Sequence, residues 1–253
     1  VSPVQQSLNA SSGLREKEIS VAQTTAEEWI EQASDKFGQG DFRGAILDLN
    51  EAIKLDPQNA TAYANRAGCR TTINDYDGAI ADATRSIELD PNKALPYVNR
   101  AVARIYLKDY RGAVDDFNQA IKLGVPPTSL FVVYYSRGEA RRLVGDLAGA
   151  IADCTKAIEL NSKSGEAYDN RGLAYVDRGD TDHAINDFQK AAELFKERKD
   201  WRNYRAVLER LQSLRARTHS TRELSVEEVD QWVTYYYLNP EPAIVPQVIA
   251  TFS

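Results

Sequence analysis

Five alanines at a nearly constant spacing restrict the fold of this chain more than any other sequence feature. They are Ala45, Ala79, Ala113, Ala150 and Ala184, which stand 34, 34, 37 and 34 residues apart. A small residue precedes each alanine by 12 positions, and an aromatic residue precedes it by 16. A period of this length is typical of stacked two-helix units, each of which packs on its neighbours. The sequence therefore predicts an all-α array.

The predicted units span residues 26–59, 60–93, 94–130, 131–164 and 165–198, and positions are numbered from the first residue of each unit. Positions 4, 8 and 11 form one helical stripe and positions 20, 24 and 27 form another, which predicts two helices per unit. Position 16 is always aspartate and is predicted to cap the second helix. Three extra residues within 124–130 are expected to lengthen the turn before the fourth unit.

This pattern resembles the tetratricopeptide repeat, which has an aromatic residue at position 4, a small one at 8, alanine at 20, a small one at 27 and proline at 32. The resemblance covers residues 26–198, roughly two thirds of the chain, and departs from the pattern at Val125 and Ser162 in position 32. It implies a right-handed α-α superhelix with C-terminal capping helices. It also implies a concave groove, lined by the first helices, that binds peptides or partner proteins without chemistry.

By this resemblance, positions 2, 5, 6, 9, 12 and 13 of the first helices face the groove. The predicted binding residues are Ile30, Phe37, Asn65, Leu95, Val98, Asn99, Val102, Tyr106, Val132, Tyr135, Asn170 and Leu173. An apolar groove with amides suits an apolar helix or extended segment whose backbone groups the asparagines would hydrogen-bond. The alternative is that neighbouring repeats or the chain's own tail shield several of these residues.

One known use of the family is tested directly by the sequence. Tetratricopeptide co-chaperones hold the C-terminal carboxylate of heat-shock chaperones with Lys, Asn, Asn, Lys and Arg at set positions. Counted from the first unit, only Asn65 matches, and the cations are replaced by Ile30, Leu95 and Asn99. Because the bidentate grip on a carboxylate needs those cations, we expect no binding of that ligand.

Opposite charges also recur in register. Position 7 carries Arg66, Arg100, Arg137 and Arg171, and position 23 carries Asp48, Asp82, Asp116, Asp153 and Asp187. Such a series could form a basic ladder for nucleic acid. Opposite charges at fixed offsets favour structural ion pairs instead, worth about 0–1 kcal/mol each where they are partly exposed.

Both ends of the chain differ from the repeats. Residues 1–25 are polar and are predicted to form an extended arm. Residues 199–218 are predicted to form a capping helix, with an apolar face made by Trp201, Tyr204, Leu208, Leu211 and Leu214. The opposite face carries Arg202, Arg205 and Arg210, which are either solvated or open to an acidic partner, RNA or a lipid surface.

Residues 219–253 are predicted to contain a further helix and an apolar tail. Ser225 and Glu228 match a capping box at the start of that helix. The tail carries Ile244, Val248, Ile249 and Phe252, and could cap the array, dock on a partner or lie in a groove.

Composition excludes several classes of function. The chain is 43% apolar with a net charge of −6, which disfavours general nucleic-acid binding. No stretch reaches the ~18–20 apolar residues of a membrane helix. The two cysteines and two histidines are scattered, so we expect free thiols and neither a metal site nor a cofactor. No phosphate loop or nucleophile–base pair indicates an enzyme.

We therefore predict a non-catalytic protein- or peptide-binding scaffold, acting as an assembly factor or complex subunit. The alternatives are a structural subunit held by its arm and tail, and an adaptor that binds RNA or anionic membranes through the basic capping helix. The sequence starts at Val1 and contains no methionine, so we expect that a leader was removed or the start trimmed. A soluble cytoplasmic protein is the default expectation, and export or organellar import after leader removal is the alternative. The oligomeric state stays open.

Overall fold

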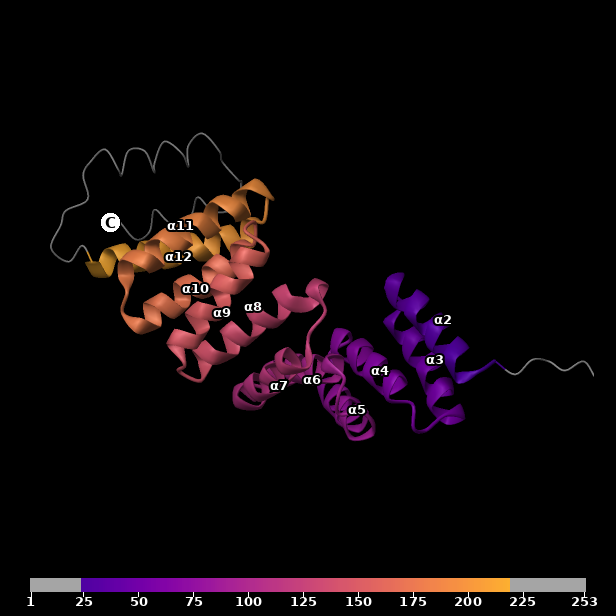
Figure 1. Ribbon diagram of the computed structural model, residues 1–253. Helices are drawn as coiled ribbons and strands as arrows, with labels where there is room; N and C mark the ends of the chain where they lie inside the picture. Colours follow the sequence, from indigo (N-terminus) through magenta and orange to yellow (C-terminus); the bar gives the residue numbers. More distant parts are fainter. Residues whose placement is uncertain (1–23, 219–253) are drawn as a thin grey trace, which may run out of the picture. The chain divides into compact units, whose positions relative to one another are not determined.

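The computed structural model describes residues 24–218, and every regular element in that range is an α-helix (Figure 1). The helices follow one another in consecutive pairs joined by short turns. The predicted arm up to residue 23, the capping box at Ser225 and the apolar tail lie outside the described residues.

The described helices belong to two compact units, which divide between Ser162 and Lys163. The helices of the first unit are α2 Ala26–Gly38, α3 Phe42–Leu55, α4 Ala60–Thr72, α5 Tyr76–Leu89, α6 Ala94–Tyr106, α7 Tyr110–Leu123, α8 Pro127–Leu143 and α9 Leu147–Leu160. Those of the second unit are α10 Gly165–Arg178, α11 Thr181–Glu197 and α12 Trp201–Thr218. The all-α fold and the two-helix repeat are thus confirmed.

The five alanines that define the period lie where the two helices of each pair touch. All five are fully buried, at 0% exposure. In the third repeat, Ala113 shares one apolar cluster with Tyr97, Ala101 and Phe117, so positions 4, 8, 20 and 24 meet as the spacing predicted. A residue with a longer side chain at position 20 would force the axes apart, because packed interiors leave no room for added methylenes.

The aspartates at position 16 cap the second helices, as predicted. In the first four repeats the carboxylate accepts the backbone N–H of the glycine three residues later, as in Asp41 with Gly44 at 2.9 Å. A Cβ on Gly44 would lie 2.1 Å from the Asp41 carboxylate, so the cap requires glycine there. The residue before the cap has a positive φ; it is glycine in three repeats but Asn74 and Lys108 in two, at 65° and 64°.

The insertion in the third repeat does not lengthen the turn, so that prediction was wrong. Three residues separate α7 from α8, whereas four separate α3 from α4. The extra residues instead extend α8, which is 17 residues long and starts at Pro127. Proline fits the first helical position because its fixed φ is helical and its missing N–H has no intrahelical acceptor there.

The arginine–aspartate ladder is confirmed, and it also ties neighbouring repeats together. Arg100 donates from Nε and Nη2 to Asp116 at 2.9 and 2.7 Å, and from Nη1 to Thr84 of the preceding repeat at 3.1 Å. Arg66 and Arg137 make the same three contacts, with Asn50 and Asn118 as the preceding-repeat partners. The aspartates are about 95% buried, so these pairs are less exposed than the sequence suggested.

The arginine at position 11 adds a second cation to most of these aspartates. Arg104 Nη1, for example, lies 2.7 Å from Asp116. The first repeat lacks the position 7 arginine, and Lys36 pairs with Asp48 instead. In the fifth repeat Tyr175 stands at position 11, so Arg171 is the only cation that pairs with Asp187 among the described residues.

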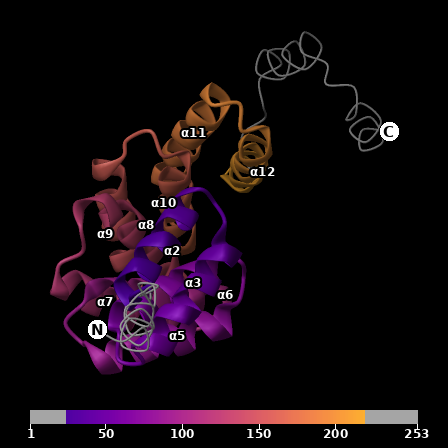
Figure 2. The same ribbon diagram turned by 90° about the vertical axis from the view of Figure 1, so that its right-hand side faces the viewer.

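Helix α12 packs on α11 and closes the second unit, as both views show (Figure 1, Figure 2). Its buried residues are Val207, Leu211 and Leu214, and they share a cluster with Phe188 and Phe195. Trp201 was predicted on this apolar face, but it is 48% exposed. Val207, by contrast, is fully buried in that cluster.

Candidate partner-binding surface

The predicted groove residues divide into an exposed group and a packed group. Phe37, Leu95, Tyr106 and Val132 are 47%, 47%, 60% and 45% exposed, and all lie at position 2, 12 or 13 of a first helix in the first unit. Leu143, at position 13 of α8, occupies a groove-facing position by the same resemblance, and at 40% exposure it joins them. We call these five residues the first-helix apolar surface.

Other predicted residues serve the interior. Val98 is buried and Val102 packs on the same cluster, whereas Ile30 packs on the cluster of the first repeat. Leu173 packs on the cluster of the second unit. Tyr135 is half-buried and stacks on Phe131, with ring centroids 6.0 Å apart. The predicted aliphatic residues at positions 5 and 9 therefore pack on the core clusters, whereas the five exposed residues stand at positions 2, 12 and 13.

The three asparagines at position 6 differ in their surroundings. Asn99 donates its amide to the Ala64 carbonyl of the preceding repeat at 2.9 Å, so one of its donors stabilises the stack. Asn65 is half-buried. Asn170, in the second unit, is 9% exposed, and its Nδ2 has no hydrogen-bond partner in the described part of the chain. The repeat pattern alone predicted that all three would hydrogen-bond the backbone of a bound segment.

A carboxylate lies on the same stripe of α8 as the apolar residues. Glu139 follows Val132 by seven residues and precedes Leu143 by four, which places the three on one helix face. It is half-buried, and burial raises its pKa, although the charge of Arg142 partly opposes this. The sequence pattern placed Glu139 at position 9, but only the structure shows that it is desolvated.

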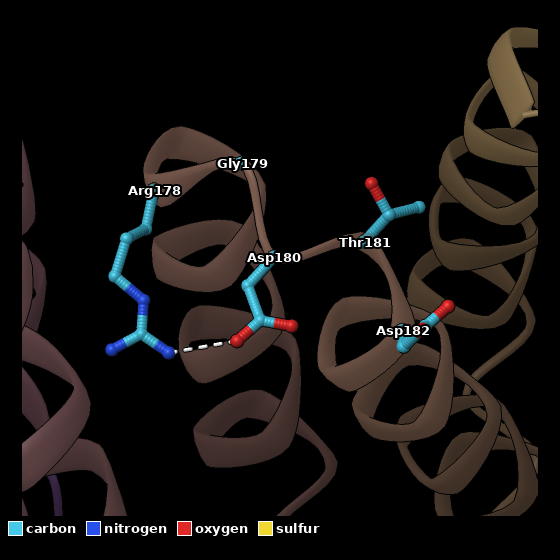
Figure 3. A pocket seen from close by; sticks show the side chains of 5 residues that line it. All are labelled: Arg178, Gly179, Asp180, Thr181 and Asp182. Atoms are coloured by element: carbon cyan, nitrogen blue, oxygen red, sulfur yellow. Dashed lines mark hydrogen bonds and ion pairs between the residues drawn. The ribbon is translucent and has the colours of Figure 1, made fainter.

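The turn between α10 and α11 forms a shallow, open hollow lined by Arg178, Gly179, Asp180, Thr181 and Asp182 (Figure 3). Asp180 accepts from Arg178 at 2.8 Å and from the His183 backbone, so it serves as the cap of α11. The carboxylates of Asp180 and Asp182 at this helix start disfavour an anion. None of the predicted groove residues lies in this hollow.

The basic face of α12 is partly neutralised. Arg210 lies 2.6 Å from Asp169 of α10, and Arg198 pairs with Glu166 and Asp200. Arg210 is therefore withdrawn from the candidate surface, while Arg202 and Arg205 are exposed. Both line a shallow depression of α12 together with Trp201 and the acidic Glu209. The residues predicted for a second surface in the tail, Ile244, Val248, Ile249 and Phe252, lie outside the described residues.

Residues 24–218 hold no group of three or more histidine, cysteine or carboxylate side chains arranged to bind a metal ion. Over the same residues, no helix combines the length and apolarity that crossing a membrane requires. Cys69 and Cys154 are free and buried, and burial raises the pKa of the Cys69 thiol to about 11.

Comparison with known proteins agrees with the repeat. Sequence models described as tetratricopeptide repeat match residues 30–94, 132–164 and 165–198. Human tetratricopeptide repeat protein 36 is 43% identical over 65 residues, which cover 24% of this chain and 34% of that protein. The chain therefore spans about a third of the length of this curated relative.

Solved structures show the same fold. The crystal structure of MamA is similar with a TM-score of 0.57 and 27% identity, covering 66% of this chain and 96% of that one. YrrB, described as a TPR protein with an unusual peptide-binding site, has a TM-score of 0.58 and 16% identity, covering 73% and 91%. The shared sequence pattern, the buried alanines and these folds lead to one conclusion: the chain belongs to the tetratricopeptide repeat family.

Proposed function

We propose that this protein is a non-catalytic scaffold that binds a segment of another protein on its first-helix apolar surface, as an assembly factor or complex subunit. One observation carries the proposal. Half of the ten large apolar side chains that are most exposed in the described range occur at positions 2, 12 and 13 of first helices. Scattered apolar residues on a surface are normal, but recurrence at the same register positions indicates a common use.

The arrangement suits a guest segment because consecutive first helices are neighbours. Helices α2, α4, α6 and α8 contact one another in sequence, so their exposed residues lie on adjoining helices. Leu95 and Tyr106 lie eleven residues apart on one stripe of α6, and Val132 and Leu143 lie likewise on α8. These two apolar stripes provide contacts for alternate side chains of a bound helix or strand.

Site-specific photocrosslinking tests the proposal. A photoreactive phenylalanine replaces Tyr106 in the full chain, and a matched control replaces Leu47, which is 64% exposed on the second helix of the first repeat. We expect a discrete crosslinked partner with the probe at Tyr106 and none with the probe at Leu47. Equal crosslinking at both positions, or none at Tyr106 in source-cell extract, would refute the surface.

The alternative of a structural subunit makes a different prediction. A subunit held by its arm and tail would lose its complex when residues 1–23 or 219–253 are removed, whereas Leu95→Ser and Tyr106→Ser would leave it bound. The adaptor alternative is weakened because Arg210 on α12 and Arg198, which lies just before that helix, are both paired with carboxylates.

A further inference from the structure

We infer that the first-helix apolar surface selects a guest segment with a lysine or arginine placed between apolar side chains, and that Glu139 is the residue that selects it. This inference rests on the proposed function and specifies the chemistry of the partner. It concerns residues of the first unit alone, chiefly on helices α6 and α8, which contact each other.

The first observation is the flanking of Glu139 by apolar groups. Val132 and Leu143 precede and follow it on the same stripe of α8, with 45% and 40% of their surfaces exposed. On the neighbouring α6, Leu95 and Tyr106 are 47% and 60% exposed. A guest that covers these four residues also covers Glu139, because the carboxylate lies between Val132 and Leu143.

The second observation is that Glu139 has no compensating hydrogen bond. Among the described residues its carboxylate has no hydrogen-bond or ion-pair partner, and the charge that acts on it is that of Arg142 on the same helix. Burial outweighs the attraction of Arg142 and raises the pKa of Glu139, so its charged form is less favourable than that of a fully solvated glutamate. A guest that removed the remaining water without supplying a cation would leave a buried unpaired charge, which is strongly unfavourable.

The third observation is the sign of the other charges. At the same positions of the first helices, the first unit carries Glu27 and Glu31, both exposed on α2, and Arg142 is the one basic residue. With three carboxylates and one arginine at these positions, the surface favours basic segments and disfavours acidic ones, because charge complementarity across an interface sets which partner is accepted.

Panning a displayed library of random 12-residue peptides on the full-length protein tests this inference. The recovered peptides are synthesised, and their affinities are measured by fluorescence anisotropy for the wild type, for Glu139→Gln and for the control Glu88→Gln. Glu88 lies exposed on α5 and pairs only with a surface arginine among the described residues. Circular dichroism confirms that each variant folds.

We expect the recovered peptides to carry lysine or arginine between apolar residues. Glu139→Gln should weaken them by about 10-fold or more, and Glu88→Gln by less than about two-fold. Replacing the peptide's lysine by norleucine should abolish the difference between wild type and Glu139→Gln, a test that leaves the protein unchanged. Peptides without basic residues, or binders indifferent to Glu139→Gln, would overturn the inference alone. A library that yields no binder would overturn the proposed function as well.

Discussion

Some buried aspartates of the described repeats pair with two arginines, and Asp187 pairs with one. Removing the position 7 arginine should therefore lower the free energy of unfolding by different amounts in different repeats. Asp116 accepts hydrogen bonds from Arg100 at 2.7 and 2.9 Å, and it also forms an ion pair with Arg104 at 2.7 Å. The ion pair with Arg104 would remain if Arg100 were removed. Asp187 accepts hydrogen bonds from Arg171 at 2.7 and 2.8 Å, and no other described cation pairs with it. The side chains of the two aspartates are only 5% and 8% exposed.

Substituting Arg171→Met should therefore leave an uncompensated buried charge, which costs about 3–5 kcal/mol of the free energy of unfolding. Arg100→Met removes charge-assisted hydrogen bonds but leaves a cation in place, so about 1–3 kcal/mol is expected. Arg111→Met, at an exposed position of α7, is the control and should change stability by less than about 0.5 kcal/mol.

Urea denaturation followed by circular dichroism measures these differences, and hydrogen exchange locates them. Because repeats unfold semi-independently, Arg171→Met should raise exchange in α10 and α11, and Arg100→Met in α6 and α7. The double variant Arg171→Met with Asp187→Leu should recover most of the loss, since an apolar pair of similar volume leaves no buried charge. Equal costs at Arg171 and Arg100, or no rescue, would refute the reasoning.

Three further outcomes follow from local geometry. Gly172→Ala should destabilise the second unit by about 1–3 kcal/mol in urea, because a Cβ there would lie 2.7 Å from the Phe188 ring; unchanged stability would show that the ring moves freely. Asp200 accepts from Asn203 at the start of α12, and this hydrogen bond lowers the pKa of the carboxyl. Its stabilisation is thus present above the ordinary aspartate pKa of about 3.9 and is lost as pH falls. Protection of the α12 amides against hydrogen exchange should therefore fall on acidification more in the wild type than in Asp200→Ala, and an equal fall in both would contradict the cap. The Cys69 thiol, with its pKa raised to about 11, should be roughly one thousandth ionised at pH 8 and resist iodoacetamide until the protein unfolds; rapid labelling of native protein would contradict its burial.

The repeat pattern predicted which residues share a helix face, but it did not predict how exposed each of them is. The register placed Leu95 and Tyr106 correctly on an exposed stripe, because helical period alone determines which residues share a face. The same register gave Val98 an equal role, yet it is 8% exposed, because burial depends on the size and distance of the adjoining helix. The extension of α8 at Pro127 and the pairing of Arg210 with Asp169 were equally inaccessible from the sequence.

The sequence by itself determined the helix pairs, the buried alanines, the aspartate caps and the arginine–aspartate pairs. All of these rest on residues within about one repeat, where fixed spacing along a helix translates directly into contact. Tertiary structure decided which arginines also hold the preceding repeat, which asparagine donors are used internally, and that Glu139 is desolvated between exposed apolar residues. These properties depend on distances and water exclusion between helices from different repeats, and no linear spacing encodes them.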